Sequence, residues 1–339
     1  MSTTTIPQTF SDLYTDLIDR SRANSSDSST VVLAKRYINT ALHDIHITRP
    51  WPWAERRAYL NTNAPYNTGT VDIALSARTT VTGSGTLWNT AVTGMGFNNA
   101  NAGGKMIFSG GNEIYEVSSV GSDTSITLAS RYIESAALSA GTYTYFEDEY
   151  ALASDFWHLI DTRQFSTPFG IEVIGRQDFY RRFPRNGSPG IPRIATIIDL
   201  APSGSVTPRS RVVFHPYPDA MYSIPYRYMT TNLAVSSTGT AATNLSSDTD
   251  EPIVPTRYRH AIVLQALVQW YRDRKDDARY QAAMQDYDAT FARMAGDYPL
   301  ENDRPRLVAT RPSRIWKGIG RRTRGKNFDV NGAFDRFEI

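Results

Sequence analysis

The 339-residue sequence predicts an α+β protein: a helical bundle formed by its N- and C-terminal helices, an inserted antiparallel β barrel or sandwich, and a basic extended C-terminal arm. Three observations support this class. Apolar residues recur at helical spacing near both ends, short β-branched and aromatic runs fill the region between them, and the last part of the chain is rich in arginine. We expect five segments: an N-terminal helical hairpin (1–60), an inserted β module (61–149), a mixed α/β region (150–250), C-terminal helices packing against 1–60 (251–300) and an extended arm (301–339).

Two helices are expected before residue 50. Thr9-Phe-Ser-Asp12 forms a capping-box pattern, in which a hydroxyl and a carboxylate satisfy free amides at the start of a helix. A second apolar series at helical spacing runs from Val31 to Ile45 and stops before Pro50 and Pro52, which predict an extended PWPW stretch. The two helices should pack as a hairpin.

The inserted β module is predicted from six short runs separated by Gly, Asn and Ser: TVDIAL, RTTVT, GKMIF, NEIYEVSSV, TSITLA and TYTYF. This punctuation is typical of a small antiparallel barrel or sandwich. The stretch 89–104 is so rich in Gly and Asn that we expect it to form a loop at one end of the module, outside its core.

The region 150–250 predicts short helices in ASDFWHLIDTR (153–163) and GRQDFYRRFP (175–184). Strands are expected in RIATIID, SRVVFHPYP and MYSIPYRYM, the last two pairing across the PYPDA turn. A low-complexity stretch, 236–252, is interpreted as a linker to the last helices.

Two C-terminal helices follow. Pro252 and Pro255 precede a helix that places His260, Leu264, Leu267, Val268 and Tyr271 on one side. The next apolar series alternates spacings of four and three, which fits a heptad-like seam between subunits or helices, or simply a core-facing helix. The predicted subunit or helix packing residues are Tyr280, Met284, Tyr287, Phe291 and Met294. Either interpretation needs a neighbouring helix, which the N-terminal hairpin can supply.

The sequence contains only weak signals for catalytic, phosphate-binding or metal sites. The chain has no cysteine, which excludes disulfides, thiolate nucleophiles and thiolate metal sites. Residues 320–327 nearly spell a phosphate-binding loop but end in Asn, and no strand precedes them. His43 and His46 lack a third metal ligand, and Glu147-Asp148-Glu149 is expected to be a solvent-exposed acidic strand exit because successive strand residues face opposite ways. We therefore predict no catalytic residues, no cofactor and no metal, hence no enzyme.

No targeting or membrane segment is expected. The N-terminus lacks the basic start and apolar run of a signal peptide, and the longest apolar stretch, 261–271, contains two Gln. The sequence predicts synthesis in the cytoplasm and no membrane anchor.

The arm has a strong charge bias. Residues 304–326 hold nine Lys or Arg and no Asp or Glu, so the rest of the chain carries a net charge of −7. Such a segment gains by neutralising phosphates or an acidic protein surface, and the alternative is a solvated tail. Leu307, Val308, Ile315, Trp316 and Ile319 lie among the arginines, and these apolar residues favour docking onto a protein over base stacking, although both are compatible with the pattern.

The order of motifs resembles a known family. WPW at 51–53, VTGSGTLWNT, FEDEYALASDFWHLID, GRQDFYRRFP, the long segment DEPIVPTRYRHAIVLQ through ARM at 250–294, and the basic arm follow one another along the chain. Together they resemble head-to-tail adaptor (connector) proteins of tailed, mainly short-tailed, bacteriophages.

The resemblance implies a structural virion protein of the neck. Its copies, commonly twelve, would form a ring between the portal protein and the tail nozzle protein, with the helices lining or bracing the channel for DNA ejection and the β insert facing outward, towards tail fibres or the neighbouring subunit. The residues expected to contact portal or, non-specifically, genomic DNA are Arg304, Arg306, Arg311, Arg314, Ile315, Trp316, Lys317, Arg321, Arg322, Arg324 and Lys326. Two alternatives stay open at this point: a virion-associated cell-wall hydrolase with a glycan-binding β insert, and a free nucleic-acid-binding protein.

Overall fold

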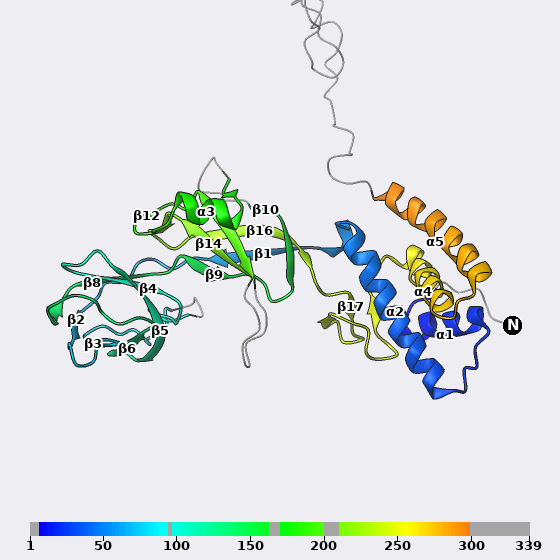
Figure 1. The fold of residues 1–339 in the computed structure, drawn as a ribbon, viewed down its shortest axis with the longest axis horizontal. Coiled ribbons are helices and arrows are strands. Elements are labelled where there is room, and N and C mark those ends of the chain that lie inside the picture. Colours follow the sequence, from blue (N-terminus) through cyan, green and yellow to red (C-terminus); the bar gives the residue numbers. More distant parts are fainter. Residues whose placement is uncertain (1–6, 94–96, 163–169, 200–209, 299–339) are drawn as a thin grey trace, which may run out of the picture.

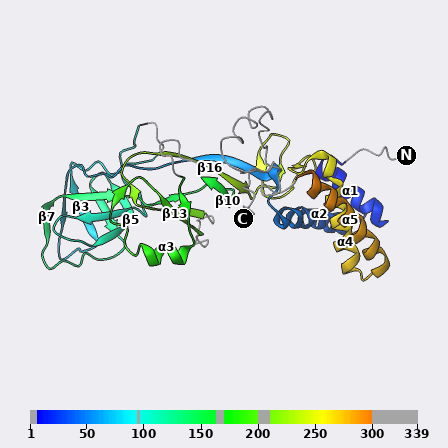
Figure 2. The ribbon, with the colours of Figure 1, turned by 90° about the horizontal axis from the view of Figure 1, so that it is seen from above.

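The computed structural model describes residues 7–93, 97–162, 170–199 and 210–298. These residues form an elongated molecule with helices at one end, a curled β sheet at the other and a second β body between them (Figures 1 and 2). The fold is mixed α+β, which confirms the predicted class at this level.

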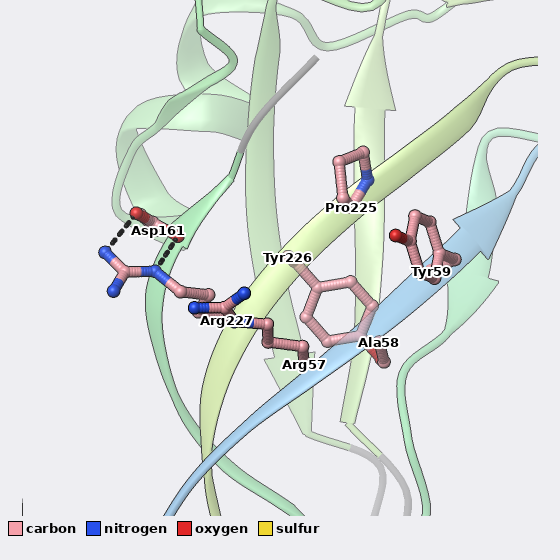
Figure 3. Close-up of a pocket in the computed structure, with 7 residues that line it drawn as sticks. All are labelled: Arg57, Ala58, Tyr59, Asp161, Pro225, Tyr226 and Arg227. Carbon is pink, nitrogen blue, oxygen red and sulfur yellow. Dashed lines mark hydrogen bonds and ion pairs between the residues drawn. The ribbon is translucent and has the colours of Figure 1, made fainter. Parts of the chain in front are cut away.

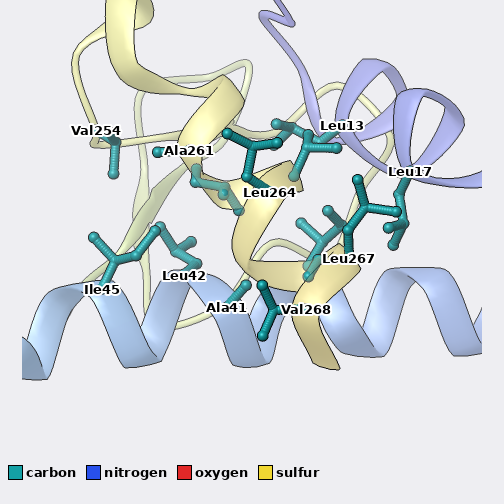
Figure 4. Packing of buried hydrophobic residues seen from close by; sticks show 14 of the residues in the cluster. Leu13, Leu17, Ala41, Leu42, Ile45, Val254, Ala261, Leu264, Leu267 and Val268 are labelled. Carbon is teal, nitrogen blue, oxygen red and sulfur yellow. The ribbon is translucent and has the colours of Figure 1, made fainter. Parts of the chain in front are cut away.

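The helical end is built from both ends of the described chain. Its helices are α1 (Phe10–Ser21), α2 (Ser28–Thr48), α4 (His260–Asp273) and α5 (Asp277–Asp297). The Thr9 hydroxyl and the Asp12 carboxylate form the predicted capping box of α1, while Asp27 caps α2. Figure 4 shows Leu264, Leu267 and Val268 of α4 between side chains of α1 and α2.

Helix α4 is more deeply buried than the sequence predicts. We expected one apolar side, but the helix is buried around its whole circumference from Ala261 to Tyr271, with Gln265 the one residue in this run that is only partly buried. The reason is its central position: α1, α2 and α5 all pack against it. A short 3₁₀ turn, η2 (Thr256–Tyr258), precedes it.

The low-complexity stretch is not a plain linker. It contains β18 (Ala241–Ala242) and β19 (Glu251–Pro252), which pair with the two edges of β17 (Ala234–Val235), the strand just before the stretch, in a small sheet. Leu245 is buried in the helical core, and the buried Asp250 carboxylate accepts hydrogen bonds from the backbone amides of Ser246 and Ser247. Polar side chains here satisfy their own backbone, so low hydropathy does not mean exposure.

The PWPW stretch also differs from the expectation. Pro52–Ala54 forms a 3₁₀ turn, η1, because Pro at a first helical position is compatible with a turn. Trp51 is fully buried, stacks on Trp53 with ring centroids 4.4 Å apart, and donates its indole N–H to the Ile45 carbonyl at 2.7 Å. The turn thus fixes the exit of α2 before the chain enters the β body.

The far end is a seven-stranded antiparallel sheet, strongly curled into a half-barrel. Its strands lie in the order β7-β2-β3-β6-β5-β4-β8. Their bounds are β2 Thr70–Ile73, β3 Thr80–Ser84, β4 Lys105–Phe108, β5 Ile114–Ser122, β6 Ser125–Leu128, β7 Leu138–Gly141 and β8 Tyr143–Phe146. Each of the six predicted runs overlaps one of these strands, whereas β7 lies in none of the runs.

The Gly- and Asn-rich loop contributes to the half-barrel core, contrary to the expectation. Ala100 is buried and donates its N–H to Trp88 O, and the Asn101 N–H donates to the Tyr145 hydroxyl at 2.8 Å. Gly104 is required here, since a Cβ atom at this position would lie 2.1 Å from the Tyr145 hydroxyl. Small residues in this loop allow close packing against a large aromatic ring.

The middle body consists of two sheets that share one core. One sheet has the order β1-β16-β10, and the other has the order β11-β13-β14-β9. The bounds are β1 Glu55–Asn61, β9 Glu149–Ala151, β10 Phe156–Thr162, β11 Glu172–Val173, β13 Ile194–Asp199, β14 Ser210–His215 and β16 Ser223–Thr230, with a short pair β12 (Pro189–Gly190) and β15 (Tyr217–Pro218). Helix α3 (Arg176–Arg182), which the sequence predicted, packs on β13.

Two predictions for the middle body are wrong. The segment expected to be a helix at 153–163 contains strand β10, which pairs with β16 and buries Phe156 against Tyr228, so tertiary pairing overrides the local pattern. Strand β14 pairs with β13 and β9, and not with β16. Pro216 and Pro218 lack N–H donors, so this segment cannot continue a hairpin ladder, and the chain crosses to the other sheet.

Candidate interaction surfaces

The predicted arm contacts, from Arg304 to Lys326, lie outside the described residues, as does the near phosphate-binding loop at 320–327. Their roles remain predictions.

The five predicted packing residues of α5 lie along its inner side. Met294 is fully buried, and the other four are partly buried against the core of the helical end. Phe291 meets the Trp51 ring edge-on at 5.7 Å, and burial raises the pKa of the Tyr287 hydroxyl to about 12. These side chains therefore pack within the subunit; a contact with another subunit through them stays a prediction.

The outer face of β1, β16 and β10 forms a shallow pocket that sequence reasoning missed (Figure 3). Arg227 of β16 makes a two-pronged ion pair with Asp161 of β10, through Nε at 2.9 Å and Nη2 at 2.5 Å, and its Nη1 lies 3.2 Å from Glu55. The hydrogen bonds with Asp161 raise the pKa of the Arg227 guanidinium. Arg57 stands directly opposite Arg227, a like-charge pairing that the two carboxylates offset.

Tyr59 continues this face beyond Arg57. It is 70% exposed and lies opposite Pro225 on β16. The alternation in ERRAYLN (55–61) could have revealed it, because Arg57 and Tyr59 fall on one side of a strand and Leu60 on the other. An exposed tyrosine beside arginines is typical of surfaces that bind proteins.

The acidic triplet 147–149 is not the solvent-exposed strand exit that the sequence predicts. Asp148 is 1% exposed: Lys105 Nζ of β4 donates to its Oδ2 at 2.6 Å, and Asn186 Nδ2 donates to the same oxygen at 3.0 Å. Asn186 Oδ1 in turn lies 2.9 Å from His215 Nδ1. Both partners of Asp148 are remote in sequence, so a local alternation rule could not find them. We call this group the Asp148 network.

The flanking carboxylates are also engaged. Glu147 accepts hydrogen bonds from the Tyr145 hydroxyl at 2.6 Å and from Asn101 Nδ2 at 2.8 Å. Glu149 pairs with Arg211 at 3.5 Å, and burial raises the pKa of its carboxyl group. Within the triplet, Asp148 joins the half-barrel to the middle body, because its partners Lys105 and Asn186 lie in these two regions.

The two histidines of the predicted pair lie in different surroundings, since His43 is exposed and His46 is buried. His46 is buried, its ring lies 4.8 Å from that of Trp157, and burial lowers its pKa. Among the described residues no three His, Asp or Glu side chains gather as a metal site would require. None of the helices in the described ranges combines the length and apolar character of a membrane span.

The described surfaces, with fixed ion pairs and exposed arginines and tyrosines, have the composition that is typical of proteins that bind other macromolecules. The comparison with known families gives this class a name. The sequence profile of the SU10 adaptor protein family matches residues 126–315, more than half of the chain, so the chain belongs to that family. It is a structural adaptor protein of phage virions, which confirms the resemblance noted from the sequence motifs. A search of curated proteins finds no match.

Proposed function

We propose that the chain is the subunit of a head-to-tail adaptor ring that joins the portal protein to the tail nozzle protein in the virion neck. The observation that carries this proposal is the family match, which runs from β6 through the middle body and α5 to residue 315 inside the arm. The ring would surround the DNA exit channel, with twelve copies as the expected number, and the chain would act without catalysis.

The distribution of structure along the chain supports these roles. Both ends of the described chain meet in one helical core, which gives a subunit a rigid base for ring packing. The half-barrel lies at the opposite end of the elongated molecule, where it can reach tail fibres or a neighbouring subunit (Figure 1). Helix α5 ends at Asp297, so the last described residues belong to the helical end.

The arm is the proposed portal-binding element. The nine cationic residues between Arg304 and Lys326 suit an acidic protein surface or DNA phosphates, and Ile315 and Trp316 supply apolar anchors. In a ring, weak contacts of individual arms add through avidity. The five segments expected from the sequence would then be the functional units. Segments 1–60 and 251–300 would together form the base of the ring, 61–149 the insert, 150–250 the middle body and 301–339 the arm.

The test is co-sedimentation of purified protein with portal protein. Deletion of 304–339 should leave the circular dichroism spectrum of the body intact but abolish association with portal rings. A charge-preserving variant, Ile315→Ala/Trp316→Ala, should weaken the association, while a matched substitution of exposed apolar residues in the body, Val32→Ala/Ile47→Ala, should not. A truncated chain that joins portal rings normally would disprove the docking role.

A further inference from the structure

A second cationic surface lies within the described part of the chain, on the middle body. Residues 176–193, called the α3 patch below, comprise α3 and the segment after it, which includes the short strand β12; they hold five arginines and one acid, Asp178. All five arginines are exposed: Arg176, Arg181, Arg182, Arg185 and Arg193. Arg181 pairs with Asp178 at 2.6 Å, and the other four form no ion pair with a described residue. This charge is available for a partner.

The α3 patch is held firmly by side chains that point inward. Phe179 is buried under the helix, and Phe183 stacks on the His215 ring with centroids 3.8 Å apart. Asn186 is buried and donates to Asp148 Oδ2 and to the Phe214 carbonyl at 2.6 Å. The exposed arginines are therefore displayed on a backbone that is already ordered, which lowers the entropy cost of binding.

Exposed apolar residues accompany the arginines. Tyr180 is 42% exposed and Ile191 is 37% exposed. Arginine and tyrosine are enriched at the centre of protein interfaces, whereas attraction to a phosphate backbone needs no apolar contact. The composition of the α3 patch favours a protein with surface carboxylates as its partner.

A second copy of the chain supplies such carboxylates. Outside 304–326 the chain has a net charge of −7. The α3 patch lies on the side of the middle body away from β1 and β16 (Figure 2). In a ring, one side of each subunit meets a different side of the next subunit, so a cationic side can face an acidic one.

We propose that the α3 patch is one half of the contact between neighbouring subunits, and that it binds carboxylates on the surface of a second copy of this chain. The inference rests on the proposed ring. The arginines provide charge-assisted hydrogen bonds and set the register, and Tyr180 provides the apolar contact.

The test compares two charge-matched variants of the full chain. Arg182→Glu/Arg185→Glu changes the α3 patch, and Arg36→Glu/Arg131→Glu changes two exposed arginines elsewhere that have no ion pair with a described residue. Sedimentation velocity is measured with and without portal protein. The first variant should need a concentration roughly tenfold higher for half-maximal assembly, while the second assembles as the wild type does. Circular dichroism checks that both are folded.

Each other outcome counts against the proposal. Normal assembly of the α3 variant, or an equal loss in both variants, would refute a specific subunit contact while leaving the ring intact. If the α3 variant assembles normally but loses affinity for duplex DNA in a salt titration, the patch is a nucleic-acid surface. A wild-type chain that stays monomeric even with portal protein would overturn both the ring and this contact.

Discussion

The helical end and the half-barrel take their core residues from differently distributed parts of the chain. The helical core joins residues from Phe10 to Met294, so it closes only when both ends of the described chain come together. The half-barrel core draws on one contiguous stretch, from Tyr66 to Tyr145. The first arrangement makes stability depend on distant parts of the chain, and the second allows a unit that can loosen alone.

The largest change in the free energy of unfolding should come from removing one buried tryptophan in each region. Trp51→Ala removes a fully buried ring, its hydrogen bond to Ile45 and its contact with Phe291, and should cost about 4 kcal/mol of the free energy of unfolding. Because Trp51 contacts both α2 and α5, its loss should lower the urea midpoint of helix unfolding, measured by far-ultraviolet circular dichroism.

Trp88→Ala is the matched variant in the half-barrel. Trp88 is equally buried and donates to the Tyr143 hydroxyl at 2.9 Å, so its loss should also cost about 4 kcal/mol, but within the half-barrel. The helical signal should keep its wild-type midpoint. If Trp88→Ala shifts the helical transition as far as Trp51→Ala does, the two regions are one cooperative unit and the comparison fails.

The joint between the half-barrel and the middle body should give the next largest effect. Asp148→Ala leaves Lys105 without its buried partner and should cost about 2 to 3 kcal/mol, less than for a fully buried pair because the Lys105 side chain is 23% exposed. Hydrogen exchange should rise in β4 and β14.

A double variant tests whether the unpaired Lys105 charge causes the destabilisation of Asp148→Ala. Lys105→Met/Asp148→Leu removes both charges and should be more stable than Asp148→Ala, because no unpaired charge remains. Equal destabilisation of the two variants would show that packing, and not the ion pair, holds the joint.

These two regions also show what the sequence can predict. The capping box at Thr9 and Asp12 and the runs of the half-barrel are local signals, and the structure has the α1 start and the strands where they were expected. Strand β10 was expected to be a helix because its pairing with β16 involves residues about 70 positions away. Local pattern cannot reveal such a partner.

The same limit applies to the candidate surfaces. The arginines of 176–193 are visible in the sequence, but their display depends on Phe179 and Asn186 being buried. The sequence predicts that Asp148 is one of three exposed acids, whereas in the structure Lys105 and Asn186 bind its carboxylate. The charge of a residue is read from sequence, whereas its partner is set by the tertiary fold.

A smaller effect is expected at the start of the helical end. Thr9→Ala removes the hydroxyl that accepts from the Asp12 amide and should cost about 1 kcal/mol. Thr9→Ser keeps the hydroxyl and should restore most of this loss. The loss should appear in urea unfolding of the helices and leave the half-barrel transition unchanged; a shift of the half-barrel would show that the two regions are coupled.

The smallest expected effect is the acid titration of the α2 cap. Hydrogen bonds from the Ser29 and Thr30 hydroxyls, at 2.7 and 2.8 Å, lower the pKa of Asp27 from its ordinary value of 3.8 to about 2. Because the folded pKa is the lower one, the stabilising contribution is present above pH 3.8 and is lost as the pH falls through about 2. A carboxyl-carbon NMR titration should show this midpoint, and Ser29→Ala should raise it, since one of the two hydroxyl donors is removed. Asp27→Asn keeps a capping oxygen without a titrating group, so it should abolish this step while the half-barrel titrates as before. A wild-type midpoint near 3.8 would mean that the hydroxyls do not hold the carboxylate in solution, and the cap would then contribute no more pH dependence to the helical end than an unbonded surface acid.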